Sequence, residues 1–548
     1  MEQRVKTSGS VVDIVNRRIV DASIDLAPDG TIAGICPERS PDRRYILPGF
    51  IDAHVHVESS MLTPTAFAQE AVRHGTVAAV TDPHEIANVL GLAGIDFMLA
   101  EAARTPFLFA TGAPSCVPAT PFETAGATLD AKAVARLLDR PAITHLAEMM
   151  NVPGVLAGDA DVLAKLAAAR LHGKPVDGHA PGLRGHDLGR YIEAGVSTDH
   201  ECLDLEEALE KAARGMHIQL RQGSAARQFE IFLPVLRRFP SLAMFCADDK
   251  HPDDLLRGYI DELVRIAVRA GVDLFDVLRA ASLNPARHYG LNMGLLQPGD
   301  RADWIEVADL KEFRVLRTVI AGQVVADAGE TRLPTLAPLA LPNRFQRRPV
   351  TAEAFRIPAR SGLCRVIGVR DGELVTDSRT ASPTIRHGQV VADPERDLVK
   401  LAVLNRYAPD TPPALALVAG TGLQRGAFTA SIAHDSHHVI AAGADDAQLA
   451  AAVNAVVAHT GGLATADEQT GVQVLPLPIA GLMGTASCQQ TAADYTRLAA
   501  IVRGNGCTLR APFMTLSFLA LPVIPALKLT DSGLFDGLRC QHVDLWTD

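Results

Sequence analysis

The chain has 548 residues, of which 48% are hydrophobic, and a formal net charge of -11 at pH 7. Its length predicts two or three domains, one of which can be a large barrel, and its eight scattered cysteines form no CxxC pair that would indicate a zinc ribbon. The negative charge without a Lys/Arg run argues against a nucleic-acid partner, and the absence of a long apolar segment argues against a membrane span, so we expect a soluble, cytoplasmic protein that binds a small molecule.

Strand-like runs flank a long central region. They lie at Val11 to Val20, Ile24 to Ile35, Ala302 to Val307 and Val315 to Ala326. Asp29-Gly30 is a hairpin-turn signal within the first group. We therefore expect one small β-sandwich domain built from residues 1–45 and 292–332, with the region between them inserted as a separate domain.

Residues 46–291 alternate strand-like runs with helical patterns. After a first strand near Ile51, the predicted strand and helix pairs are Thr76 to Thr81 with Ile86 to Ala103, Phe107 to Ala110 with Ala131 to Leu138, Ala142 to Ala147 with Ala160 to Ala169, Val176 to Gly178 with Asp187 to Ala194, Ser197 to His200 with Leu205 to Arg214, Ile218 to Leu220 with Glu230 to Arg238, and Ala243 to Ala247 with Asp254 to Ala270. About eight such units predict an α/β fold, a (β/α)8 TIM-type barrel. A doubly wound open sheet is the alternative, but no glycine-rich phosphate turn follows any strand.

Polar residues gather at the carboxyl ends of these strands. His54 and His56 close the run LPGFIDAHVHVESS, and side chains two apart on a strand share a face, which suits a metal ion. The corresponding positions after later strands hold Asp82, His84, Glu85, Glu148, His179, His200, Asp248 and Asp249. Barrel enzymes place their chemistry at this end of the strands. Any one of these residues could cap a helix or be an ordinary buried histidine, but together they favour a metal site.

The last third of the chain follows a connector, residues 333–360, which is rich in Pro, Arg and Thr. Residues 361–548 predict an α+β domain. It contains the motif AHDSHH, with His434, Asp435, His437 and His438. From the residues alone this cluster could be a third metal site, a substrate-contacting loop or a hydrogen-bonded anchor.

The order of these motifs resembles the amidohydrolase superfamily. HxH after the first strand, an acid after the fourth, single histidines after the fifth and sixth, and an aspartate after the eighth form its pattern. The stretches AEMMNVPGV, GTGLQRGAFTASIAHDSHHVIAAG and PFMTLSFLALPVIPALKLTD are more specific and are similar to the bacterial adenine deaminases, over nearly the whole chain.

This resemblance implies a binuclear centre of two divalent ions per chain. His54, His56, Glu148 and Asp248 would hold one ion, and Glu148 would bridge to a second ion held by His179 and His200. Ligands of these types fit Mn, Fe(II) or Zn. The implied reaction is hydrolytic deamination of adenine, rather than adenosine, to hypoxanthine and ammonia by a hydroxide that bridges the two metal ions, with Asp248 as the proton shuttle.

Other residues are predicted around this centre. His84 and Glu85 are expected near the substrate, although they could simply begin the helix at Ile86. Since side chains alternate along a strand, only one of the adjacent aspartates should point into the barrel mouth. The resemblance assigns that place to Asp248, so Asp249 should face the following loop and pair with Lys250 or cap the helix near Pro252. Supporting contacts to the site are expected from Asp82, Asp249, His434, Asp435 and His437.

Two alternative functions stay open at this stage. Another amidohydrolase activity, on an N6-substituted adenine or a cyclic amide, fits the same scaffold. A non-catalytic metal-binding protein would predict lost ligands, and no expected ligand is missing from the sequence. We expect a cytoplasmic homodimer that acts in purine salvage.

Overall fold

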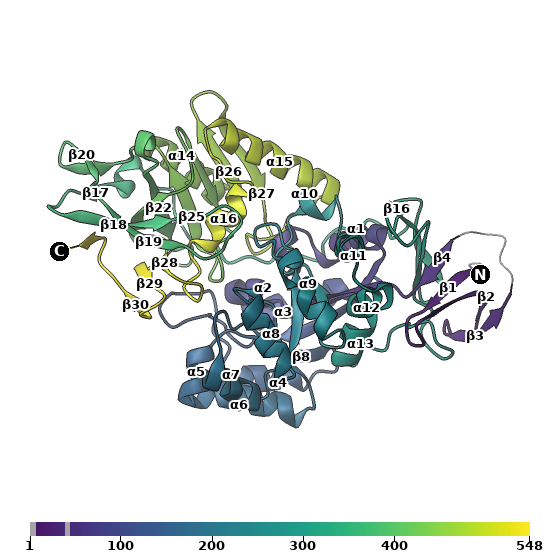
Figure 1. Ribbon diagram of the computed structural model, residues 1–548. Coiled ribbons are helices and arrows are strands. Elements are labelled where there is room, and N and C mark those ends of the chain that lie inside the picture. Colours follow the sequence, from purple (N-terminus) through teal and green to yellow (C-terminus); the bar gives the residue numbers. More distant parts are fainter. Residues whose placement is uncertain (1–6, 39–43, 548) are drawn as a thin grey trace.

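The computed structural model describes residues 7–38 and 44–547 and forms three parts, with the barrel between a small N-terminal sheet and a large C-terminal domain (Figure 1). Residues 1–6 and 39–43 of the first predicted segment, and residue 548, lie outside the described residues.

One eight-stranded sheet combines strands from both sides of the barrel segment, in the order β16-β15-β14-β13-β4-β1-β2-β3. Its strands are β1 (Thr7–Asp13), β2 (Arg18–Leu26), β3 (Ile32–Pro37), β4 (Tyr45–Leu47), β13 (Trp304–Val307), β14 (Val315–Ile320), β15 (Gln323–Asp327) and β16 (Glu330–Thr331). The single strand expected from Val11 to Val20 is wrong, because the chain turns between β1 and β2, where the Asp13 carboxylate accepts from the backbone N–H of Asn16. The sandwich arrangement stays a prediction.

Eight parallel strands form the predicted barrel. They are β5 (Phe50–Val55), β6 (Thr76–Thr81), β7 (Leu108–Ala113), β8 (Ile143–Met149), β9 (Val176–Gly178), β10 (Thr198–Asp199), β11 (His217–Arg221) and β12 (Ala243–Cys246). Regular pairing gives a five-stranded sheet, β5 to β9, and a three-stranded sheet, β10 to β12. Parallel bridges Val176–Val196 and Val55–Asp248 join the two sheets at both edges and close the ring.

Helices surround the barrel strands. They are α1 (Pro64–Ala71), α2 (His84–Leu90), α3 (Leu92–Ala102), α4 (Ala131–Leu138), α5 (Val152–Ala157), α6 (Ala160–Leu171), α7 (Gly185–Glu193), α8 (Leu205–Ala213), α9 (Phe229–Arg238), α10 (Pro252–Leu255), α11 (Ile260–Arg269), α12 (Leu274–Leu278) and α13 (Asn284–His288). The single helix expected from Ile86 to Ala103 is two helices, because Gly91 has a φ of 62° that ends α2. The helix expected from Asp254 to Ala270 is likewise divided into α10 and α11.

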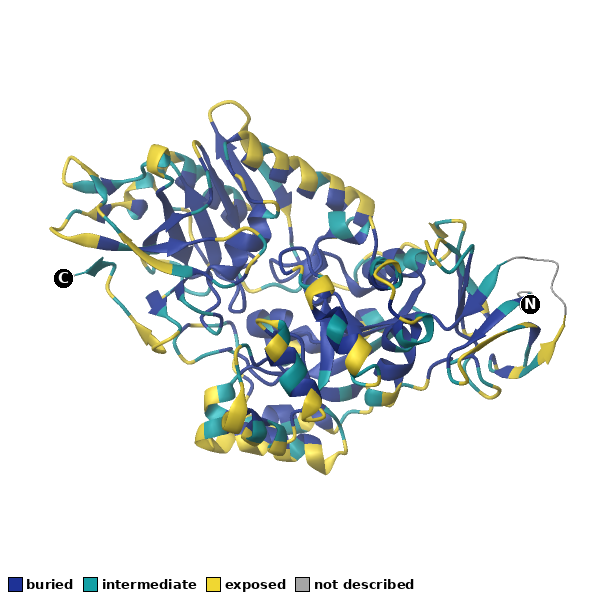
Figure 2. Ribbon diagram, viewed as in Figure 1, coloured by how far each residue is buried: buried dark blue, intermediate teal, exposed yellow. Residues whose placement is uncertain are grey.

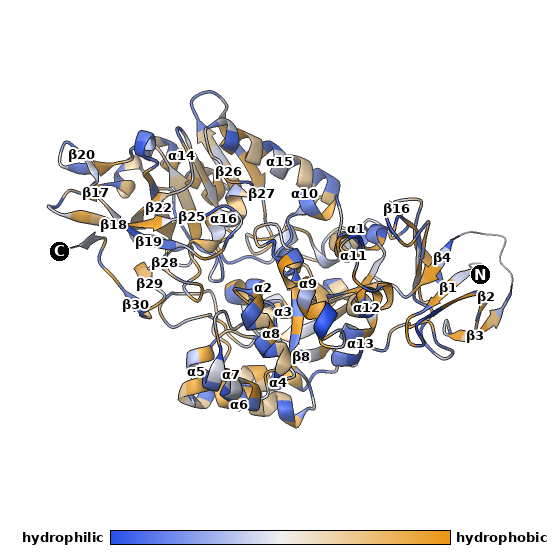
Figure 3. Ribbon diagram, in the orientation of Figure 1, coloured by the Kyte–Doolittle hydropathy of each residue, from blue (hydrophilic) through white to orange (hydrophobic). Residues whose placement is uncertain are grey.

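The barrel strands are buried and the helices expose only their outer faces (Figure 2). Strands such as β6, TVAAVT, are buried at every position, which explains why they have continuous apolar runs rather than alternation. In the hydropathy view the helices carry both hydrophobic and hydrophilic residues, as expected for helices that bury one face and expose the other (Figure 3).

The C-terminal domain is built on a nine-stranded sheet with the main order β19-β18-β23-β22-β25-β24-β26-β27, and β31 pairs with β18. Its strands and helices are β17 (Ile357–Pro358), β18 (Leu363–Gly368), β19 (Asp377–Ala381), β20 (Thr384–Arg386), β21 (Gln389–Val391), β22 (Val399–Leu404), β23 (Ala414–Ala419), β24 (Ala427–Ala430), β25 (Val439–Gly443), α14 (Asp446–Ala458), β26 (Gly462–Asp467), β27 (Gly471–Pro476), α15 (Cys488–Gly504), α16 (Pro512–Phe518), β28 (Leu527–Thr530), β29 (Gly533–Asp536), β30 (Gln541–His542) and β31 (Trp546–Thr547).

This domain packs directly on the barrel. Helix α15 lies against α10 and α1, and the backbone N–H of Gly484 donates to the Met61 carbonyl at 2.8 Å. Apolar side chains of both parts belong to one contiguous core, so the C-terminal domain is a fixed wall over the barrel rather than a separate module. Within the described residues, no helix is both long and apolar enough to cross a membrane.

Candidate metal centre

The barrel brings the predicted ligands together at the carboxyl ends of its strands. His54 lies at the end of β5, His56 follows it, and Asp248 follows β12, which is the neighbour of β5 in the closed ring. The Nε2 atoms of His54 and His56 are 3.2 Å apart, and Asp248 Oδ1 lies 3.5 Å from the first and 3.3 Å from the second. All three side chains are buried.

Glu148, at the end of β8, presents one oxygen to each of two groups of histidines. Its Oε1 lies 3.3 Å from His56 Nε2 and 4.0 Å from His54 Nε2. Its Oε2 lies 2.9 Å from His179 Nδ1 and 3.3 Å from His200 Nε2. Burial raises the pKa of this carboxyl, but the surrounding imidazoles, His200 first, more than offset that effect and hold it well below its usual value. This is the geometry that a bridging carboxylate requires.

These spacings fit bound metal ions. Ligand atoms at 2.0–2.1 Å from one ion lie about 3.0–3.4 Å from one another, close to most of the separations among His54, His56, Asp248 and Glu148. Hydrogen bonding also orients the ring of His56, because its Nδ1 donates to the Asp82 carbonyl at 3.0 Å and leaves Nε2 free as a ligand. Mixed imidazole and carboxylate donors suit a divalent transition metal.

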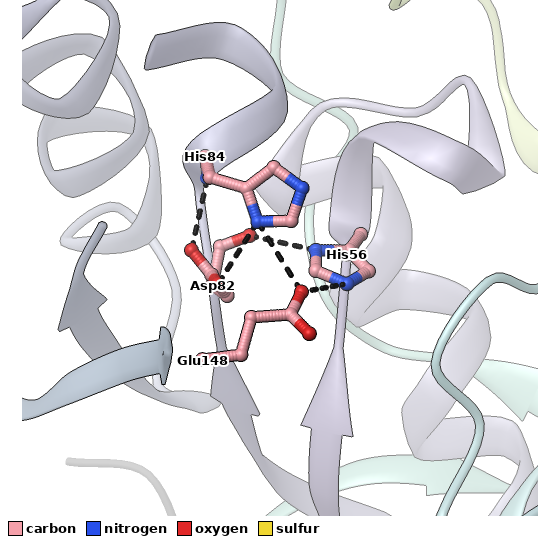
Figure 4. A group of neighbouring side chains, drawn as sticks. All are labelled: His56, Asp82, His84 and Glu148. Carbon is pink, nitrogen blue, oxygen red and sulfur yellow. Dashed lines mark hydrogen bonds and ion pairs between the residues drawn. The ribbon is translucent and has the colours of Figure 1, made fainter. Parts of the chain in front are cut away.

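Asp82 and His84 lie beside this group (Figure 4). His84 Nδ1 is 2.9 Å from Asp82 Oδ2 and 3.4 Å from Glu148 Oε1, so the imidazole lies between the two carboxylates. Its Nε2 faces the other way, 3.7 Å from Asp435 Oδ2 of the C-terminal domain. Both His84 and Glu85, which were predicted near the substrate, line the cavity above the ligands.

The predicted orientation of Asp249 is wrong. Asp248 has a left-handed φ of 57°, which interrupts the alternation of an extended strand, and both adjacent aspartates line the cavity. Asp249 accepts a short hydrogen bond from the Ser59 hydroxyl, whereas Lys250 pairs with Glu262 at 3.0 Å. Burial and the nearby charge of Asp248 raise the pKa of Asp249 to about 6.

Arg221 and Glu201 also belong to the site, although they were not predicted. Arg221 ends β11, and its Nη1 donates to Asp248 Oδ2 at 2.7 Å while both its terminal nitrogens pair with Glu201. Burial raises the pKa of Asp248, but this guanidinium and the two neighbouring imidazoles hold it well below its usual value. A charged residue at the end of a barrel strand was the sequence signal that could have identified Arg221.

The AHDSHH motif of the C-terminal domain contacts the barrel through Glu85. His434 Nδ1 lies 2.7 Å from Glu85 Oε1, and His437 Nε2 is in close contact with Glu85 Oε2. The three side chains are near enough to hold a metal ion, but His437 Nδ1 accepts from the Ala433 N–H, which leaves the ring proton on the nitrogen that faces Glu85. This tautomer favours the hydrogen-bonded anchor over a third metal site. His438 lies apart from Glu85, with Nε2 2.9 Å from the Thr124 carbonyl.

The two domains enclose a narrow cavity of about 20 Å³ above the ligands. Apolar side chains of the C-terminal domain form one wall: Leu374, Phe518, Leu521 and Ile524. The Phe518 ring stacks on His434 with a centroid distance of 4.3 Å. An apolar wall opposite convergent polar groups is the lining that a small, flat, polar ring requires, and these side chains would have to move apart to admit one.

The two larger parts of this chain are similar in sequence to known protein families. Residues 45–325 match the model of the amidohydrolase family, and residues 373–541 match that of the adenine deaminase C-terminal domain. The chain is 52% identical to an adenine deaminase of Salinibacter ruber, with 99% of each chain covered. It is 47% identical to an adenine deaminase of Methanosarcina acetivorans, with 99% and 100% covered, and 48% identical to one of Sulfurovum sp., with 98% and 99% covered.

Proposed function

The chain belongs to the adenine deaminase family of the amidohydrolases, and on this premise we propose that it hydrolyses adenine to hypoxanthine and ammonia at the centre formed by His54, His56, Glu148, His179, His200 and Asp248. The observation that carries the assignment of the centre is the position of Glu148, with one oxygen toward His54 and His56 and the other toward His179 and His200.

Two divalent ions held by these residues, Mn, Fe(II) or Zn, would supply Lewis acidity and would lower the pKa of a bound water. The protein contributes the proton transfers. Asp248 directs Oδ1 toward His54 and His56, while Arg221 holds Oδ2, so one oxygen is placed to take a proton from the attacking water and return it to the purine. The low pKa of Asp248 keeps this carboxylate ionised before attack.

The cavity walls orient the purine. The side chains of Phe518 and Leu521 offer an apolar face to the ring, and His84 and Glu85 offer polar atoms to its edge. Two imidazole contacts fix the Glu85 carboxylate, so its position is set before substrate binds. Enclosure by the C-terminal domain limits the water in the cavity, which strengthens these polar contacts.

Turnover of a panel of adenine, N6-methyladenine, adenosine, cytosine and dihydrouracil, followed as loss of each substrate by chromatography, tests this proposal. Adenine should be turned over with a kcat/KM at least tenfold above that of each other compound. Faster turnover of N6-methyladenine, cytosine or dihydrouracil would refute it, and no turnover of any compound with metal fully bound would point to a non-catalytic protein. The expected homodimer and the cytoplasmic location stay predictions. Sedimentation measurements of the mass in solution would test the first, and cell fractionation would test the second.

A further inference from the structure

Two carboxylate oxygens of residues that line the cavity have no hydrogen-bond partner among the described residues, Glu85 Oε2 and Asp435 Oδ2. Glu85 Oε2 lies in close contact with His437 Nε2, whereas Asp435 Oδ2 has no such neighbour. Asp435 is 2% exposed, and its Oδ2 accepts no hydrogen bond. The nearest charged nitrogen in an ion pair with it, His84 Nε2, is 3.7 Å away, beyond hydrogen-bond distance. A buried carboxylate oxygen without a donor is costly, so it indicates a donor that arrives with a ligand.

The carboxylates of Glu85, Glu201, Asp248 and Asp249 already have a nitrogen or a hydroxyl against them. Arg221 donates to Glu201 and Asp248, and the Ser59 hydroxyl donates to Asp249. Glu85 has His434 hydrogen-bonded to one oxygen and the His437 ring in close contact with the other. Asp435 therefore differs from its neighbours in being available to substrate.

Asp435 lies across the His84 ring from the bridging carboxylate. The two ring nitrogens of His84 face opposite ways, with Nδ1 3.4 Å from Glu148 Oε1 and Nε2 3.7 Å from Asp435 Oδ2. A substrate whose reacting carbon lies beside Glu148 and Asp248 would extend its far end along the cavity toward Asp435. In adenine, the far end from the amino-bearing carbon is the five-membered ring.

We propose that Asp435 accepts a hydrogen bond from the N–H of the five-membered ring of adenine, and that this contact selects the free base over bases substituted on that ring. The inference rests on the proposed function. Free adenine has one N–H on this ring, whereas a nucleoside or a base methylated on that ring has none and would place a lone pair or an alkyl group against a buried carboxylate. A site built to bind an N–H discriminates strongly against analogues that lack it.

The test compares kcat/KM for adenine and 9-methyladenine in the wild type, Asp435→Ala and Asp435→Asn, measured as ammonia release. Loss of a hydrogen bond to a charged acceptor should lower adenine turnover in Asp435→Ala by roughly 10- to 150-fold. The ratio of adenine to 9-methyladenine turnover should fall with it, since the variant no longer needs the N–H. Asp435→Asn should shift the preference toward 9-methyladenine, because its amide NH2 can donate to the unprotonated ring nitrogen.

Asp410→Ala is the matched control, since it removes an exposed carboxylate of the same domain that pairs with Arg348. Its substrate ratio should equal that of the wild type. Thermal unfolding and metal content identify a variant that fails to fold, and the Asn variant preserves the shape of the side chain if Asp435→Ala does fail. An unchanged ratio in folded Asp435 variants would overturn this inference alone. No ammonia from adenine with the wild type would overturn the proposed function and this inference with it.

Discussion

Replacing Asp248 by Asn tests the proton shuttle and the role of Arg221 together. Arg221 Nη1 donates to Asp248 Oδ2 at 2.7 Å, and an amide has only one acceptor, so the Asn oxygen should take that position. Its NH2 would then face the Nε2 atoms of His54 and His56, where Oδ1 now lies 3.5 and 3.3 Å away. That nitrogen neither binds a cation nor accepts a proton.

The variant should therefore lose metal as well as rate. Loss of general acid/base catalysis costs roughly 100- to 10,000-fold, about 3 to 5 kcal/mol of barrier. The assay is kcat/KM for adenine, with metal content measured by elemental analysis on the same sample. Asp249→Asn is the control. The Asp249 carboxyl has a pKa of about 6, and an amide oxygen can keep the contact with the Ser59 hydroxyl. We therefore expect kcat/KM to change by less than about tenfold. Full metal and near wild-type rate in Asp248→Asn, or loss of turnover only in Asp249→Asn, would refute the reasoning.

Three further predictions follow from buried charges. Glu148→Gln must turn its NH2 toward one of the two histidine groups. We therefore expect fewer than two metal ions per chain and at least about a hundredfold loss of the deamination rate. Full metal content would contradict the role of Glu148 as the bridging carboxylate. Arg221→Met leaves the buried Glu201 and Asp248 carboxylates without their cation and should lower the free energy of unfolding by about 3 to 5 kcal/mol in a urea titration. The stability of Arg221→Lys should lie between those of the wild type and Arg221→Met. Equal stability of all three proteins would argue against a structural ion pair. Burial lowers the pKa of His74, but Asp261 and Glu70 more than offset this and raise it to about 9. The stabilisation from protonated His74 is then complete below pH 6.5 and lost as pH rises through 9, so the Tm gap between the wild type and His74→Gln should close over that range, and a constant gap would exclude this titration.

Local pattern was enough to predict much of the barrel. Helix α4 at Ala131–Leu138 and strand β9 at Val176–Gly178 lie at their predicted bounds. Strong periodicity and complete burial define such elements without help from distant residues. The predicted elements were wrong at Gly91 and at the turn between β1 and β2. At both places a few residues in a left-handed or turn conformation interrupt a run whose composition is continuous.

The candidate site was less accessible to such reasoning. Strand alternation predicted that Asp248 and Asp249 diverge, but it assumes extended backbone, and the positive φ of Asp248 removes that assumption. The wall formed by Phe518 could not be inferred from spacing, since it depends on how a domain more than two hundred residues away packs on the barrel. Arg221 could have been identified from its place at a strand end.

The small sheet has a consequence for biosynthesis. Strand β4 pairs with β13 through Ile46 and Glu306. One edge of β4 therefore stays unpaired during synthesis until its partner strand, about 260 residues later in the chain, has been made. At about 5–20 residues per second, that delay is roughly 13 to 50 s. An unpaired strand edge is a template for pairing between chains, so nascent molecules on one messenger are exposed to aggregation throughout this interval. Yield in a cell should therefore depend on how well this edge is shielded on the ribosome, even if the finished sheet is highly stable.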